Sequence, residues 1–310
     1  MGFNVLHFCL NLIKIPRFAP YISGLFFFNG IRSMRVQALI FISSTTMSIS
    51  SSSEFRMVRV GNTSFTIDKR YSNLKEIGSG AYGVVAKAVD LRTGRKVAIK
   101  KVKHVFCNVE DATRILRELK LLNHFNNHEN VVQLLDIMAF PPNTERFQDI
   151  YIVTNFMDKN LGRVVDSSKQ KLSDQHLQYF LYQILRGLKY VHSANVLHRD
   201  LKPENIVVNV NCDLALCDFG LSRGYDDKVH HLTEYVVTRH YRPPELLLEC
   251  AMYGKPVDVW SVGCIFAELI LRTPMFRGDT PQHQLRLIVE KIGQTFFPYR
   301  FDTDELSKTA

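Results

Sequence analysis

The segment from Val196 to Glu245 constrains this chain more than any other part of its sequence. It reads VLHRDLKPENIVVNVNCDLALCDFGLSRGYDDKVHHLTEYVVTRHYRPPE, with a His-Arg-Asp loop, an Asp-Phe-Gly turn, a Thr-Glu-Tyr tripeptide and a Pro-Pro-Glu end in that order. Asn205 and Asp218 offer amide and carboxylate oxygens, which are hard ligands of the kind that Mg²⁺ prefers. Asn205 and Asp218 are therefore candidate ligands of Mg²⁺.

A glycine-rich motif, GSGAYGVV, occupies residues 78–85. We expect strands over 71–77 and 84–89 on either side of it and a third strand over 96–102. Glycines allow a hairpin backbone to approach phosphate oxygens that a Cβ atom would keep away. Dinucleotide-binding folds share this spacing, but here the motif lies between two strands and Val-Ala-Ile-Lys follows at 97–100. The pattern predicts a nucleotide-binding hairpin.

The rest of the chain alternates between strand and helix patterns. Asn108 is a plausible cap for a helix from about Val109 to Asn123, buried through Ile115, Leu119 and Leu122. Further strands over 131–138 and 150–154 would complete a five-stranded sheet. A long helix capped by Ser173 carries apolar residues at helical spacing and would anchor the loop that follows it.

From about Phe65 to Gly293 the chain resembles the mitogen-activated protein (MAP) kinases, most strongly over 179–205 and 212–245. Thr233-Glu234-Tyr235 resembles the dual phosphorylation site of the extracellular-signal-regulated group. The resemblance implies an α+β, bilobal protein kinase fold. It has a five-stranded N-terminal lobe with one helix and a mainly helical C-terminal lobe.

The resemblance also implies domain bounds. Residues 55–310 would form the kinase domain, with the N-terminal lobe over about 65–157 and the C-terminal lobe over about 158–310. The chain closes at Ala310, where the family continues through further helices. We therefore expect a C-terminal lobe that is incomplete, and a Glu245 that lacks the late arginine with which its relatives pair it.

Roles for individual residues follow from the resemblance. Asp200 would orient a substrate hydroxyl and accept its proton, and Lys202 would neutralise charge on the transferring phosphoryl group. Glu118 would pair with Lys100 and hold it against the ATP phosphates. Asn205 and Asp218 would hold Mg²⁺. The residues implied in ATP binding are Ile77, Gly78, Gly80, Gly83, Val85, Ala98, Lys100, Thr154, Met157 and Asp218.

Phosphates on Thr233 and Tyr235 would each add about −1.5 to −2 charges. Such charge orders a loop when arginines stand ready as bidentate partners. By resemblance, the residues that receive phospho-Thr233 are Arg117, Arg199 and Arg223, and those that receive phospho-Tyr235 are Arg239 and Arg242. Thr238 would brace the catalytic loop, and Asp258 would hold its backbone.

Several residues depart from the family pattern. Pro243 stands where the family has Ala, His240 where it has an aromatic residue, Ser222 where it has Ala, and Glu204 where it usually has Ser. Paired prolines restrict the residues before them and remove backbone donors. The pocket for the residue after the target Ser or Thr, which Arg242 would shape, is therefore expected to differ from that of the relatives.

Composition narrows the alternatives. The chain has 310 residues, of which 46% are hydrophobic, enough for a substantial core, and a net charge of +9. No groove-reading or base-stacking motif accompanies that charge, so nucleic-acid binding is disfavoured. The 6 cysteines form no C-x-x-C pair, which favours free thiols in a reducing compartment.

Residues 1–54 differ from the rest. They are apolar and aromatic, contain no acid before Glu54 and end in a Ser/Thr-rich run. No apolar run approaches the ~20 residues that span a bilayer. We expect a disordered extension, or translated sequence upstream of a start at Met34, Met47 or Met57. A mitochondrial transit peptide is the alternative. The expected location is the cytoplasm and nucleus.

The leading hypothesis is an ATP- and Mg²⁺-dependent, proline-directed Ser/Thr kinase activated by an upstream MAP kinase kinase. The alternative is a catalytically impaired fragment or decoy that binds MAP kinase partners, since Leu172, His176 and Tyr179 match part of the family's docking groove. A cyclin-dependent type is disfavoured by Tyr235, which such enzymes lack. The expected partners are the upstream kinase, proteins with Ser/Thr-Pro sites, phosphatases and docking proteins, without nucleic acid or membrane.

Overall fold

The computed structural model describes residues 30–45, 54–80, 83–125, 127–142, 144, 146–167, 171–225, 238–250 and 253–293. The chain divides between Asp158 and Lys159 into two compact units. Thr233 and Tyr235 lie outside the described residues, as does the chain after Gly293. The two units are described in turn.

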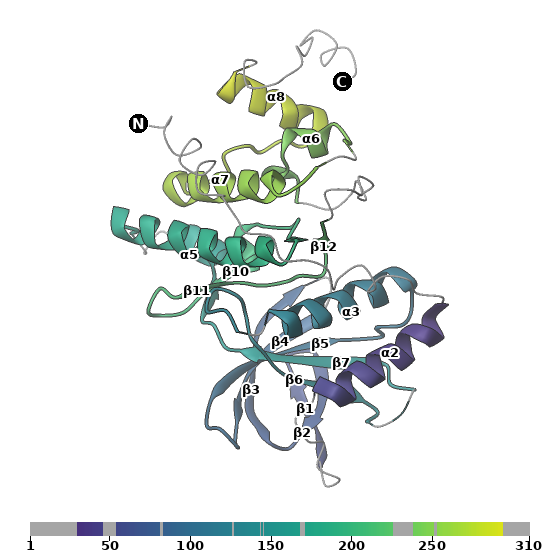
Figure 1. Ribbon diagram of the computed structural model, residues 1–310. Coiled ribbons are helices and arrows are strands. Elements are labelled where there is room, and N and C mark those ends of the chain that lie inside the picture. Colours follow the sequence, from purple (N-terminus) through teal and green to yellow (C-terminus); the bar gives the residue numbers. More distant parts are fainter. Residues whose placement is uncertain are drawn as a thin grey trace. The chain divides into compact units, whose positions relative to one another are not determined.

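The N-terminal unit contains a five-stranded antiparallel sheet, as expected (Figure 1). Its strands run in the order β3-β4-β5-β7-β6. The sheet differs from the sequence expectation mainly at its edge strand β6. This strand begins at Leu134 rather than at 131, and a register shift between Leu134 and Asp136 interrupts its pairing with β7. The strands are β3 Tyr71–Gly80, β4 Gly83–Asp90, β5 Lys96–Val102, β6 Leu134–Phe140 and β7 Asp149–Asn155.

One face of this sheet is covered by a hairpin that the sequence analysis did not predict. The hairpin consists of β1 (Phe55–Val60) and β2 (Thr63–Asp68). Its Phe65 and Ile67 are fully buried, and the backbone N–H of Thr66 donates to the Tyr151 hydroxyl at 2.9 Å. The residues of this core are Val60, Phe65, Ile67, Tyr71, Ala86, Ala88, Val97, Ile99, Met138, Tyr151 and Val153. The opposite face of the sheet carries the side chain of Lys100, which alternates with the buried Ile99 along β5.

Helix α3 (Val109–His124) begins and ends close to the expected bounds. Asn108 caps it as expected, because its side-chain oxygen accepts from the Asp111 backbone N–H at 2.7 Å. Ile115, Leu119 and Leu122 are buried along it.

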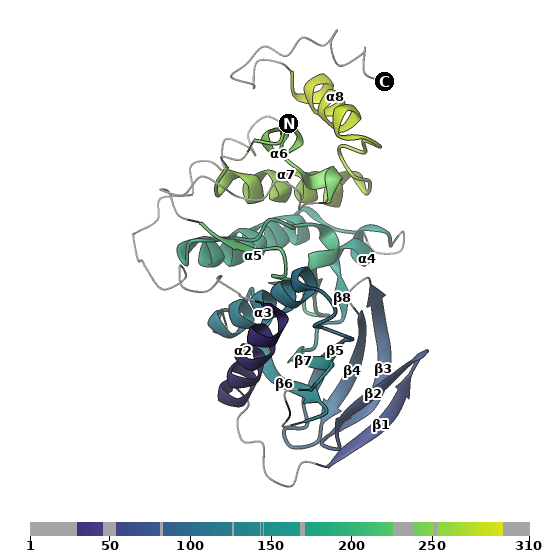
Figure 2. The ribbon, with the colours of Figure 1, turned by 90° about the vertical axis from the view of Figure 1, so that its right-hand side faces the viewer.

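A second helix, α2 (Gly30–Thr45), corrects the expectation for the N-terminal segment. We expected residues 1–54 to be disordered or translated in error. For residues 30–45 the expectation of disorder is wrong, because they form a helix that packs against α3 and β6, as both views show (Figures 1 and 2). The helix carries Val36, Leu39, Ile40 and Phe41 in addition to its buried residues, so its apolar stripe does not stand out from the sequence.

The C-terminal unit is mainly helical, as expected. Its central helices α5 (Asp174–Ser193) and α7 (Pro256–Leu271) pack together (Figure 1). The remaining helices are α4 Leu161–Val165, α6 Pro244–Leu247 and α8 Pro281–Ile292, with 3₁₀ turns η1 Pro203–Asn205 and η2 Arg239–Tyr241. The short strands are β8 Lys159–Asn160, β9 Val196–Leu197, β10 Ile206–Val208, β11 Leu214–Leu216 and β12 Arg223–Gly224.

Helix α5 anchors the loop that follows it. Ser173 caps its start in a capping box with His176, and Phe180, Ile184 and Val191 form its buried stripe. β9 then pairs antiparallel with β12, and this pairing joins the two ends of the 198–222 segment. Within the part of the chain that the structure describes, no helix has the length and apolar character needed to cross a membrane.

Candidate active site

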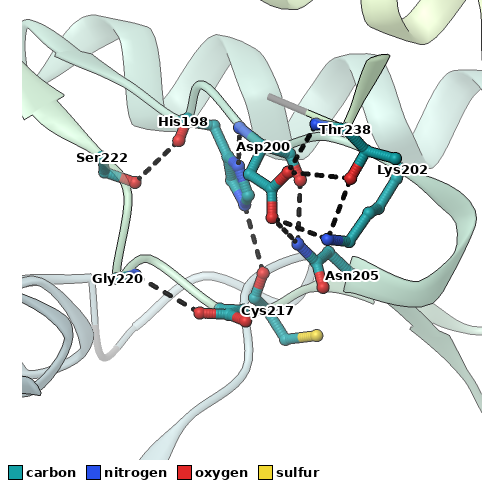
Figure 3. Close-up of polar contacts among 9 residues, drawn as sticks. His198, Asp200, Lys202, Asn205, Cys217, Gly220, Ser222 and Thr238 are labelled. Atoms are coloured by element: carbon teal, nitrogen blue, oxygen red, sulfur yellow. Dashed lines mark hydrogen bonds and ion pairs between the residues drawn. The ribbon is translucent and has the colours of Figure 1, made fainter. Parts of the chain in front are cut away.

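Asp200 lies at the centre of a polar cluster in the C-terminal unit (Figure 3). Its side chain is 6% exposed, and its Oδ2 accepts from the Lys202 ammonium at 2.9 Å. The Asn205 amide nitrogen donates to the same oxygen at 2.8 Å. On the other side, the backbone N–H and hydroxyl of Thr238 both approach Oδ1 at 3.4 Å. Two turns of chain therefore fix this carboxylate, because η1 supplies Asn205 and the segment before η2 supplies Thr238.

Asn205 is oriented by its contacts with Asp200. Its Nδ2 donates to both the backbone carbonyl and the carboxylate of Asp200, each at 2.8 Å. Because the nitrogen is engaged there, the amide oxygen is left as an acceptor. Asp218 is half-buried and follows β11 in the next part of the chain. An amide oxygen and a carboxylate are suitable ligands for Mg²⁺, so these residues fit the ion that the resemblance implies.

Asp258 on α7 holds the backbone that precedes Asp200, as the sequence analysis expected. Its Oδ2 accepts from the His198 N–H at 2.9 Å, and its Oδ1 from the Arg199 N–H at 2.8 Å. His192 Nε2 lies 2.7 Å from Oδ2, a contact that the sequence analysis missed. Burial alone would raise the pKa of Asp258, but the hydrogen bond and charge of His192 hold it below its ordinary value.

His198 connects this loop to the Asp-Phe-Gly turn. Its ring packs on Phe219, with ring centroids 5.0 Å apart, and its Nε2 lies 3.1 Å from the Cys217 carbonyl oxygen. Ser222, noted as a departure from the family, is fully buried and donates to the His198 carbonyl at 3.1 Å (Figure 3). The hydroxyl is thus satisfied, and it adds a tie between the two loops.

The backbone adopts left-handed geometry beside both loops. Arg199 has φ 68° and Asp218 has φ 63°, a conformation that residues with a Cβ atom adopt at a cost of about 1–3 kcal/mol. Such geometry persists where surrounding contacts enforce it, and the Asp258 carboxylate does so at Arg199. The two strained residues adjoin Asp200 and Phe219, which places the strain at the candidate site.

In the N-terminal unit, Lys100 on β5 and Glu118 on α3 form the expected ion pair. Lys100 Nζ lies 2.8 Å from Oε1 and 2.9 Å from Oε2 of Glu118. The Glu118 side chain is 6% exposed, and that of Lys100 is 22% exposed. One carboxylate therefore holds the ammonium, and part of the Lys100 side chain stays exposed.

Val85, Ala98 and Thr154, three of the residues expected to bind ATP, lie on the same face of the sheet as Lys100. Val85 is the register partner of both Gly78 and Lys100, and Ala98 is the partner of Thr154. These side chains are half-buried, whereas Ala86, Val97, Ile99 and Val153 of the same strands are buried on the opposite face. Alternation along the strands thus gathers these residues on one face. Ile77, near the end of β3, and Met157, which follows β7, are also half-buried.

The glycines divide into two kinds. A Cβ atom at Gly78 or Gly80 would meet nothing within 4 Å, so the hairpin leaves open space there. At Gly83, with φ +141°, a Cβ atom would lie 1.9 Å from the Lys101 carbonyl oxygen. The fold itself therefore requires glycine at 83, which is a different reason from the one that the sequence suggested. Residues 81 and 82 are not described.

The arginines expected to receive phosphate are placed as follows. Arg117 is 4% exposed on α3, whereas in the C-terminal unit Arg199 is 2% exposed and Arg242 is 8% exposed. The Arg199 guanidinium lies 5.6 Å from the centroid of the Tyr253 ring, a contact that the sequence analysis missed. Arg223 begins β12, and Arg239 Nη1 donates to the Asp279 carbonyl at 2.6 Å. The residues that would carry the phosphates are not described, so these roles stay predictions.

The Pro243-Pro244 pair is accommodated at the start of α6, where a missing N–H costs little. Just before it, the Tyr241 hydroxyl donates to Glu268 Oε2 at 2.7 Å. Burial raises the pKa of Glu245, which has no ion-pair partner among the described residues.

The geometry on both units is that of a protein kinase. The protein kinase domain family matches residues 71–309. This chain belongs to that family.

Its relatives include plant MAP kinases. The chain is 55% identical over 231 residues to mitogen-activated protein kinase 7 of Arabidopsis thaliana, an alignment covering 74% of this chain and 62% of the relative. It is 56% identical over 231 residues to mitogen-activated protein kinase 4 of Oryza sativa subsp. japonica, with the same coverage. The resemblance to MAP kinases is therefore confirmed, and the chain spans about 62% of the length of these relatives.

Proposed function

We propose that this chain is a proline-directed Ser/Thr protein kinase that transfers the γ-phosphoryl group of ATP. The observation that supports this most is the arrangement around Asp200. A carboxylate held by Lys202, Asn205 and Thr238 suits a group that orients a hydroxyl and accepts its proton. Phosphoryl transfer needs such positioning and charge stabilisation more than covalent catalysis.

The other expected residues fit roles around the nucleotide. Lys100, held by Glu118, would bind the α- and β-phosphates, and Lys202 would neutralise charge on the transferring group. Asn205 and Asp218 would hold Mg²⁺, which when bound neutralises charge on the phosphate oxygens. The open space at Gly78 and Gly80 leaves room for phosphates.

We further propose activation by dual phosphorylation of Thr233 and Tyr235 by a MAP kinase kinase. Support comes from the resemblance to MAP kinases and from the arginines at 117, 199, 223, 239 and 242. Substrates with Ser/Thr-Pro sites, phosphatases and docking proteins are the proposed partners, and the cytoplasm and nucleus the proposed location.

The test uses the purified chain after treatment with an active MAP kinase kinase. Peptides that contain Ser-Pro, Ser-Ala or Ala-Pro are offered with Mg·ATP, and phosphate incorporation is measured. We expect transfer to the Ser-Pro peptide only. Absence of transfer, with phosphates mapped to Thr233 and Tyr235, would instead favour a non-catalytic protein that binds MAP kinase partners.

A further inference from the structure

Helix α2 buries one face within the N-terminal unit. Met34, Ala38 and Ile42 are 1%, 0% and 4% exposed, and they recur every fourth residue along the helix. This spacing places them on one side. By contrast Ile40, on the same helix, is 64% exposed. A helix with one buried apolar face and one exposed face is packed as part of a folded unit.

The elements against which α2 packs are those that carry the Lys100–Glu118 pair or adjoin it. α2 lies along α3, the helix of Glu118, and against β6 (Figures 1 and 2). Its Arg35 guanidinium lies 5.2 Å from the centroid of the Phe106 ring. Phe106 belongs to the connection between β5, which carries Lys100, and α3. α2 therefore touches both the helix of Glu118 and the segment that leads into it.

That connection is itself well anchored. Phe106 is 5% exposed and packs edge-on against the buried Phe147, with ring centroids 5.2 Å apart. The Val105 N–H donates to the Gln148 carbonyl at 3.0 Å. The start of α3 is thus held from the strand side by these contacts, and from the outside by Arg35 of α2.

We propose that α2 is a positioning element for α3: its buried face fixes the helix, and so keeps the Glu118 carboxylate opposite Lys100. The occupant of the α3–β6 surface is thus residues 30–45 of this chain. This proposal rests on the proposed function in one respect: the Lys100–Glu118 pair serves to bind nucleotide phosphates. The packing of α2 on α3 is independent of that function.

The test compares Ile42→Asp with Ile40→Asp in the full chain. The two variants place the same charge on the same helix, once on its buried face and once on its exposed face. Hydrogen exchange is measured over 109–124 and, as a reference, over 174–193 in the C-terminal unit. A nonhydrolysable Mg·ATP analogue reports nucleotide affinity.

For Ile42→Asp we expect exchange over 109–124 to be about tenfold faster or more, because local opening follows the loss of buried contacts. We expect the analogue to bind severalfold more weakly and exchange over 174–193 to stay unchanged. Ile40→Asp should match the native chain in every measurement. Ile42→Ala is a milder change and should give an intermediate effect. If the Ile42→Asp variant does not fold, Ile42→Ala takes its place in the comparison.

Unchanged exchange over 109–124 in the Ile42 variants would overturn the proposal. Equal acceleration over 174–193 would also overturn it, because α2 would then stabilise the whole chain without positioning α3. A native chain that fails to bind the analogue would contradict the proposed function instead, and the exchange data would still decide whether α2 positions α3.

Discussion

The Asp258 carboxylate accepts a hydrogen bond from the backbone N–H of Arg199 at 2.8 Å, and the two residues are 59 positions apart in the chain. A side chain on α7 thereby fixes the backbone immediately before Asp200. Because Arg199 has a left-handed conformation, the contact also stabilises geometry that the residue would otherwise rarely adopt. The position of the candidate catalytic carboxylate thus depends on a buried charge that does not itself touch it.

Replacing Asp258 with Ala should destabilise the protein strongly. The change leaves His192 and two backbone N–H groups without their acceptor in a buried site, a loss that typically costs about 3–5 kcal/mol. Urea unfolding measures the difference. Asp279→Ala is the matched control, because the Asp279 side chain is 90% exposed and its loss should cost less than about 0.5 kcal/mol. Equal stability of the two variants would contradict the assigned role of Asp258.

Thr238 should matter for turnover through its hydroxyl. Thr238→Ala removes the oxygen that contacts both Lys202 Nζ, at 3.2 Å, and Asp200 Oδ1, at 3.4 Å. We expect kcat to fall by about 10- to 100-fold, since loss of alignment at a reacting group carries a penalty of that order. Thr238→Ser keeps the hydroxyl and should retain most of the activity. If Ser and Ala lower kcat alike, the methyl group and not the hydroxyl is what matters.

The Glu245 carboxyl group should make the stability of the folded protein depend on pH. Its pKa in the folded protein is raised by burial from 4.5, so the folded state binds this proton more tightly than the unfolded chain does. Its contribution therefore favours folding at low pH and is lost as the pH rises through the folded pKa. Glu245→Gln cannot ionise. The variant should match the native chain at pH 4 and be more stable than the native chain at pH 8.

The measurement is denaturant unfolding at both pH values. The exposed Glu249 offers the control, since Glu249→Gln should change stability little at either pH. A Glu245→Gln variant less stable than the native chain at pH 8 would mean that the ionised carboxylate has a stabilising partner after all.

The sequence predicted the parts of the fold whose signals are local. Asn108 and Ser173 mark helix starts through capping chemistry that a few residues specify. The five strands were predictable from their apolar and β-branched runs, and the motif around Asp200 from its spacing. The start of the edge strand β6 was placed three residues early, because the extent of an edge strand is decided by its pairing with β7 and not by its composition.

The features that the sequence analysis missed depend on tertiary contacts. The contact between His192 and Asp258 joins residues 66 positions apart, and neither residue type implies the other. Helix α2 was missed because apolar residues occur on several sides of it, so that no single apolar face stands out in the sequence. Its packing against α3 and β6 decides which of these residues are buried. The β1–β2 hairpin was missed because its burial depends on packing against residues of the five-stranded sheet that are distant in sequence.

Asp200→Asn tests most directly the proposal that Asp200 orients the substrate hydroxyl and accepts its proton during phosphoryl transfer. The variant keeps the size of the side chain and removes its ability to accept a proton. With the chain phosphorylated on Thr233 and Tyr235, kcat for a Ser-Pro peptide should fall by about 10²- to 10⁴-fold while Mg·ATP affinity stays unchanged. Asp279→Asn should retain native activity. A kcat for Asp200→Asn within a fewfold of the native value would contradict the account.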